Sequence, residues 1–157
     1  MKMEELTKVL RDAGVVGAGG AGFPSYAKLN KAADTIILNC AECEPLLKLH
    51  RQVLEKYAFE ILTALDYVSK AVGAERVIIA VKNSYQGAIG AVKANMASFK
   101  NVEIGILPEI YPAGDEVITI YETTGRVVPQ GNIPISVGVI VFNVETMLNA
   151  YYAIKNN

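Results

Sequence analysis

The 157-residue sequence predicts a three-layer α/β domain, in which helices cover a mainly parallel sheet of about four strands. Three observations support this class. Four short apolar runs are typical of buried strands, segments with helical spacing of apolar residues separate them, and Gly, Pro or Asn stands at the junctions. Strands that alternate with helices form parallel sheets whose faces the helices bury. We therefore expect one Rossmann-like domain over residues 1–157.

The N-terminal quarter of the chain predicts a helix, a loop and a strand. Apolar residues recur at helical spacing in Met3–Ala13, and Gly14 is a typical helix end. Residues 26–33 indicate a short helical or irregular connection. Thr35–Asn39 is a short, continuous, β-rich apolar run, which predicts a buried strand.

The middle of the chain predicts two helices and two further strands. Pro45 suits a first helical turn, and one apolar face then continues to Gly73, which predicts a single long helix. Arg76–Val81 is the next apolar run, and helical spacing is present again in Ser84–Phe99. Val102–Leu107 predicts the third strand, which Pro108 ends.

The C-terminal third predicts a helix, a turn-rich connection, a last strand and a closing helix. The helices are expected at Glu116–Thr123 and Val144–Ile154, and the strand at Val137–Phe142. Glycine and proline dominate Gly125–Pro134 between them.

The stretch 14–28, GVVGAGGAGFPSYAK, holds five of the thirteen glycines. Gly17, Gly19, Gly20 and Gly22 leave a run of amide groups with no side chains over them. Bared N–H groups form anion-binding nests, and Lys28 can add a charge-assisted hydrogen bond. The stretch therefore indicates a phosphate-cradling loop, with a flexible turn between two elements as the alternative.

The spacing of the glycines also fits the dinucleotide fingerprint, and Glu42 and Glu44 stand at the expected distance. The context does not fit, because a strand should precede the loop and a helix should open directly after it. Here a helix precedes the loop, and Pro24 interrupts the segment after it. We therefore interpret the loop as a phosphate cradle of a different kind.

Polar motifs fall at the ends of the predicted strands. NCAECEP comes after the first strand, YPAGDE lies just past the third, and Asn143 ends the last. In open α/β sheets ligands bind outside the carboxyl ends of the strands. The three motifs should therefore meet at one crevice.

GAGGAGFPSYAK, NCAECEP, YPAGDE and NVET, in this order, resemble the FMN/NADH-binding domain of the respiratory complex I flavin subunit. The similarity is closer to the C subunit of the Rnf electron-transport complex and to the related cobalamin reductases. The four blocks span almost the whole chain. The resemblance implies FMN and NADH as cofactors and an iron–sulfur electron-transfer domain or subunit as partner. Because those relatives continue into further domains, we expect the chain to be an excised domain or a short form.

The resemblance also implies roles for individual residues. Lys28 matches the phosphate-binding lysine, Asn39 and Asn143 match asparagines that contact the flavin, and Tyr111 matches a tyrosine that approaches it. The other implied contacts are the stacking Phe23, Gly114, Asp115 and Glu116 of the second acidic loop, and Thr146 of NVET. Phe142 stands where the complex I subunit has another asparagine, so the resemblance does not carry that flavin contact over to this chain.

Structural alternatives stand beside several of these roles. Asp115 suits a helix N-cap, and Glu44 suits an acidic residue at a helix N-terminus. The sequence offers no such reason for Glu42, so Glu42 and Glu44 are predicted to accept the ribose hydroxyls of NADH and to repel the 2′-phosphate of NADPH. His50 is alone on a predicted helix and receives no role.

Composition restricts the function further. The net charge is −1, which is atypical of a nucleic-acid or anionic-membrane footprint. No apolar run reaches the ~18 residues of a membrane span. We expect a cytoplasmic protein, with any membrane contact made through partner subunits and without direct insertion.

The sequence thus predicts an electron-transfer flavoprotein domain that binds FMN and accepts a hydride from NADH, an oxidoreductase of the NADH dehydrogenase type. A non-catalytic flavin or nucleotide module is one alternative. A dithiol redox module is another, because Cys40 and Cys43 have C-x-x-C spacing. The acidic residue between the two thiols is expected to raise the thiol pKa, which disfavours this alternative.

Overall fold

A computed structural model describes residues 1–44 and 46–157 and contains a four-stranded sheet in the order β3-β2-β1-β4. All three strand pairs are parallel. The strands are β1 (Thr35–Asn39), β2 (Arg76–Lys82), β3 (Val102–Leu107) and β4 (Val139–Asn143). The predicted α/β class with a parallel sheet is confirmed.

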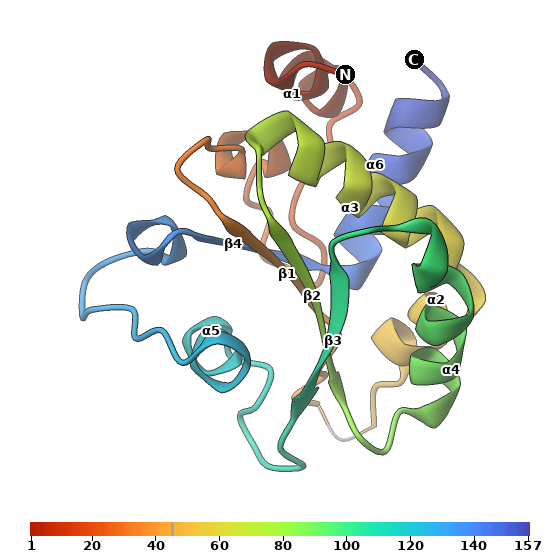
Figure 1. The fold of residues 1–157 in the computed structure, drawn as a ribbon, viewed down its shortest axis with the longest axis vertical. Coiled ribbons are helices and arrows are strands. Elements are labelled where there is room, and N and C mark those ends of the chain that lie inside the picture. Colours follow the sequence, from red (N-terminus) through yellow and green to blue (C-terminus); the bar gives the residue numbers. More distant parts are fainter. Residues whose placement is uncertain (45) are drawn as a thin grey trace.

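Helices cover the two faces of the sheet unequally (Figure 1). One face carries α1 (Met3–Asp12), α2 (Leu49–Lys56), α3 (Ala58–Val72), α4 (Gln86–Asn95) and α6 (Val144–Lys155), and the other carries α5 (Glu116–Thr124). Single turns of 3-10 helix occur at η1 (Ser25–Lys28), η2 (Met96–Ser98) and η3 (Pro134–Val137).

The core is divided by the sheet because successive side chains of a strand point to opposite faces. Ile36 and Leu38 of β1 pack into the larger cluster beneath α1, α3, α4 and α6, whereas Ile37 packs with Ile120 of α5. Burying both faces explains why β1 and β2 are continuous apolar runs in the sequence.

The prediction of one long helix down to Gly73 is wrong, since two helices, α2 and α3, meet at Tyr57. Tyr57 has φ −125° and ψ 32°, outside the helical region. The two helices have different neighbours, because α2 packs mainly on α4 and α3 mainly on α6. The chain therefore changes direction at Tyr57 because the two helices pack on different neighbours, although the apolar pattern of the sequence continues through the break. The predicted helix start at Pro45 lies outside the described residues.

Smaller differences concern element ends. The helix predicted over Ser84–Phe99 is divided into α4 and η2. The last strand begins at Val139, since Gly138 has φ +75° and ends η3 just before it. In the described part of the chain, no helix is both long and apolar enough to span a membrane.

Candidate functional site

The C-terminal edge of the sheet brings the predicted polar motifs together. Asn39 at the end of β1 pairs in register with Asn143 at the end of β4. The Asn39 side chain donates from Nδ2 to the carbonyl oxygen of Gly114 at 2.8 Å and accepts from the Ala41 amide at 3.0 Å. NCAECEP, YPAGDE and Asn143 thus lie at one edge of the sheet, as predicted, and a crevice between them stays a prediction.

Gly114 allows the two acidic loops to approach closely. A Cβ atom at this position would lie 2.2 Å from the carbonyl oxygen of Ala41 and 2.9 Å from the sulfur of Cys43. Asp115 then caps α5, since its Oδ1 accepts from the amides of Val117 at 3.0 Å and Ile118 at 3.2 Å. Asp115 is therefore the N-cap of α5, which is the structural alternative that the sequence offered for this residue.

The glycine loop folds back on itself beside α6. The Gly17 amide donates to the Phe23 carbonyl oxygen at 2.8 Å, and the Gly22 amide donates to the Gly17 carbonyl oxygen at 2.9 Å. Consecutive positive φ angles at Gly19 (+69°) and Gly20 (+90°) require glycine. The Ala18 amide donates to Thr146 Oγ1 at 3.0 Å, which ties the loop to the first turn of α6.

Three exposed amides of this loop are available to a ligand. Within the described ranges, the N–H groups of Gly19, Gly20 and Ala21 donate to no protein acceptor. A run of such groups in a turn of positive φ forms a concave anion site. This arrangement suits a phosphate.

Lys28 connects the glycine loop to the other motifs. Its Nζ donates to the carbonyl oxygen of Val141 in β4 at 2.8 Å and lies 3.7 Å from Oε1 of Glu116 at the start of α5. The ammonium group is thereby held between β4 and the start of α5, with 31% of the side chain exposed.

Glu42 has a structural role that the sequence did not suggest. It is 6% exposed, and its Oε1 accepts from the backbone amide of His50 at 3.1 Å. It therefore caps the N-terminal turn of α2, whose N-cap residue Lys48 makes no side-chain cap bond. The other carboxylate oxygen, Oε2, is buried and has no partner in the described part of the chain. Glu44, in contrast, is exposed.

His50 contacts the site, which sequence reasoning missed. Its Nε2 lies 2.9 Å from Nδ2 of Asn143. Asn143 uses its other side-chain atom, Oδ1, to cap α6 by accepting from the amides of Glu145 at 2.8 Å and Thr146 at 3.4 Å. No signal in the sequence pairs the two side chains, because the contact joins residues 93 positions apart.

Two aromatic rings are exposed among these motifs. Tyr111 of YPAGDE is 80% exposed and Phe23 of the glycine loop is 49% exposed. Large exposed apolar groups commonly mark ligand or partner sites. These rings are available to a planar ligand; the resemblance implies that Phe23 stacks on the nucleotide and that Tyr111 approaches the flavin.

Cys40 and Cys43 are not joined by a disulfide. Burial raises the pKa of the Cys40 thiol far above its usual range, and the nearby carboxylate of Glu42 adds to the effect. The thiolate is the reactive form of cysteine. The environment of Cys40 therefore argues against the dithiol redox alternative.

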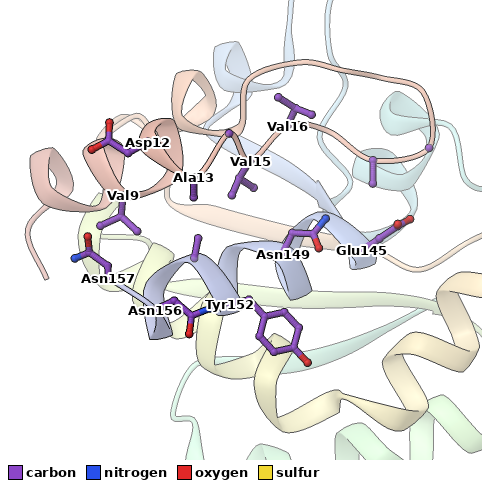
Figure 2. Close-up of a pocket in the computed structure, with 14 residues that line it drawn as sticks. Val9, Asp12, Ala13, Val15, Val16, Glu145, Asn149, Tyr152, Asn156 and Asn157 are labelled. Atoms are coloured by element: carbon purple, nitrogen blue, oxygen red, sulfur yellow. The ribbon is translucent and has the colours of Figure 1, made fainter.

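A separate cavity of about 640 Å³ lies between the C-terminal end of α1, the start of the glycine loop and α6 (Figure 2). Its lining includes Asp12, Val16, Glu145, Asn149 and Tyr152. It shares Ala18 and Gly19 with the glycine loop, but Asn39, Gly114 and Lys28 do not line it. The convergent motifs are thus outside this cavity.

Comparisons of the sequence with a family model and with known proteins indicate the same family. Residues 10–152 match the Nuo51 FMN-binding domain. The chain is 47% identical over 146 residues to the cobalamin reductase PduS of Citrobacter freundii, covering 93% of this chain and 32% of that protein. It is 36% identical over 150 residues to the C subunit of the Na⁺-translocating ferredoxin:NAD⁺ oxidoreductase complex of Acetobacterium woodii, covering 93% of this chain and 34% of that protein. The chain thus spans about a third of the length of these two relatives.

A solved structure shares the fold. A chain of the NAD⁺-reducing [NiFe]-hydrogenase in the H₂-reduced state superposes with a TM-score of 0.84 and 24% sequence identity, covering 99% of this chain and 31% of that chain.

Proposed function

The chain belongs to the Nuo51 FMN-binding domain family, and on this premise we propose that it binds FMN at the C-terminal edge of its sheet and accepts a hydride from NADH. Electrons would then pass to an iron–sulfur domain or another redox partner. The family is one of electron-transfer oxidoreductases, as its similarity to cobalamin reductase and to the C subunits of ion-translocating complexes indicates.

One observation carries the FMN assignment. The amides of Gly19, Gly20 and Ala21, which donate to no acceptor among the described residues, lie in the loop whose far end places Lys28 at the sheet edge. Backbone N–H groups and one ammonium are a donor set suited to a phosphate, which binds several donors at once. FMN carries such a phosphate and riboflavin does not.

The isoalloxazine ring of FMN would be held by the side-chain amides of Asn39 and Asn143, which lie beside the phosphate cradle. Asn39 and Asn143 are register partners at the ends of neighbouring strands, and both side chains have fixed orientations. Tyr111 would approach the ring from the second acidic loop. Their work is to orient the ring, since the bound flavin itself supplies the capacity to accept a hydride and release single electrons.

NADH would enter from the side of the acidic residues. Exposed Glu44 would accept ribose hydroxyls and repel a 2′-phosphate, and Glu116 would flank the nicotinamide nucleotide. Phe23 would stack on the nucleotide. Buried Glu42 would act chiefly by capping α2 and so fixing the acidic loop. Its Oε2, which has no partner among the described residues, is buried and would receive a ribose hydroxyl only if the loop opened.

We place the protein in the cytoplasm, with partner subunits making any membrane contact. The alternative function is a flavin-binding module that does not turn over, which the same phosphate cradle would support.

Fluorescence titration tests the FMN assignment. Adding the protein to FMN should change the flavin fluorescence with one site per chain, and riboflavin should bind more weakly because it lacks the phosphate. Fluorescence that stays unchanged at high protein concentration would contradict the proposal. Equal affinity for the two flavins would remove the phosphate argument.

A further inference from the structure

We propose that His50 is a positioning residue for the flavin site, which orients the amide of Asn143 by accepting a hydrogen bond on Nε2. The inference rests on the proposed function, in which Asn143 contacts the flavin. The conclusion about the imidazole itself comes from the geometry of the protein alone.

The groups around the Asn143 oxygen determine which end of the side-chain amide faces His50. Oδ1 faces the backbone N–H groups of Glu145 and Thr146, which only donate. The NH₂ group must therefore face His50, at 2.9 Å from Nε2. Because the NH₂ group only donates, Nε2 must accept, and a neutral imidazole then carries its hydrogen on Nδ1.

The backbone of His50 is fixed as well. Its amide donates to Oε1 of Glu42, so the first turn of α2 is anchored to the acidic loop after β1. Its Nδ1 is buried and has no partner within the described residues. Nε2 is thus the ring nitrogen that has a partner among these residues, and its contact with Asn143 restrains the imidazole and the amide together.

A continuous series of hydrogen bonds then links the acidic loop to the phosphate cradle. Glu42 accepts from the His50 amide, and Asn143 donates to the His50 ring. Asn143 caps α6 at Thr146, whose hydroxyl oxygen accepts from the Ala18 amide. Of the two Asn143 NH₂ hydrogens, one is used by His50, and the second has no acceptor among the described residues and remains for a ligand. By holding the first hydrogen, His50 sets the direction in which the second N–H group of Asn143 points.

The histidine is the only one in the chain, so its imidazole nitrogens give unambiguous NMR signals in untagged protein. Nitrogen-15 spectra of the free protein should show Nδ1 protonated and Nε2 unprotonated. A hydrogen on Nε2 would overturn the proposal. This measurement does not depend on whether the protein binds FMN.

The functional arm compares His50→Leu, His50→Gln and Gln52→Leu in FMN titrations. Leucine removes the acceptor, so affinity should fall about tenfold, equivalent to about 1.4 kcal/mol, the scale of one hydrogen bond. Glutamine keeps an acceptor near the position of Nε2 and should bind FMN within about threefold of the unmodified protein. Gln52 is exposed on the same helix, so Gln52→Leu is the matched control and should bind normally.

Each outcome bears on a separate claim. Normal FMN affinity of His50→Leu would overturn the positioning role, and so would equal weakening of both His50 variants, because ring packing would then be the cause. If His50→Leu does not fold, the His50→Gln titration and the NMR spectrum decide. Absence of FMN binding by the unmodified protein would refute the proposed function, while the NMR spectrum would still decide the state of His50.

Discussion

Replacing Gly114 by alanine tests whether the two acidic loops depend on the contact between Gly114 and Ala41. The added Cβ would lie 2.2 Å from the carbonyl oxygen of Ala41, and neither backbone segment is a flexible side chain that could swing away. The loops would have to separate. The bond from Asn39 Nδ2 to the Gly114 carbonyl, now 2.8 Å long, would be strained or lost.

Two contributions give the magnitude. Overpacking at a tightly packed site costs about 1–3 kcal/mol. Loss of a hydrogen bond costs about 1 kcal/mol. Gly114→Ala should therefore lower the free energy of unfolding by about 2–4 kcal/mol. It should also weaken FMN binding, since Asn39 would lose one of the two hydrogen bonds that orient its side chain.

Urea unfolding followed by circular dichroism measures the effect, with Gly90→Ala as the matched control. Gly90 lies inside α4, and a Cβ added there would meet no atom within 4 Å. Alanine should stabilise that helix by up to about 1 kcal/mol. The same substitution should thus have opposite signs at the two positions. Unchanged stability and FMN affinity in Gly114→Ala would refute the close approach of the loops.

Three further predictions concern charged residues. Lys28→Met should weaken FMN binding by about 10–150-fold, equivalent to the ~1.5–3 kcal/mol of a hydrogen bond to a charged group. It should leave the affinity for riboflavin nearly unchanged, and titration calorimetry with both flavins checks this. Glu44→Gln should reduce the preference for NADH over NADPH without releasing FMN, as measured by reduction rates with each nucleotide; an unchanged preference would contradict it. The guanidinium of Arg126 lies 2.7 Å from Asp34 and lowers the pKa of that carboxyl. The pair therefore stabilises the fold fully at pH values above the unfolded pKa of about 4. This stabilisation is lost as the pH falls through the lower pKa of the folded state. Arg126→Gln should therefore be less stable near neutral pH, with the ion pair itself contributing under about 1 kcal/mol because it is so exposed. The difference should shrink in acid to what the pH-independent bond from Arg126 to the Val137 carbonyl contributes, and a difference that does not change with pH would argue against the ion pair.

Local patterns predicted the parts of the structure that depend on local physics. The strand Thr35–Asn39 and the N-cap at Asp115 are explained by a short apolar run and by a side chain that competes for helix amides. The placement of NCAECEP and YPAGDE at one edge is explained by the rule for parallel sheets.

The features that the sequence did not predict depend on contacts between residues that are far apart in the sequence. The break at Tyr57 separates two helices with different neighbours, and the apolar pattern is the same with or without it. The cap that Glu42 provides for α2 requires knowing where that helix begins, which the sequence placed at Pro45. The contact between His50 and Asn143 exists only once β4 lies beside β1.

Anaerobic stopped-flow absorbance of the FMN-loaded protein tests the central claim most directly. On mixing with NADH, the oxidised flavin band should bleach, and NADPH should bleach it much more slowly because its 2′-phosphate would face the carboxylate of Glu44. Bleaching by NADH in this order of preference is the behaviour expected of a hydride-accepting flavin domain. Bound FMN that stays oxidised under excess NADH would contradict the account and leave the flavin-binding module as the function.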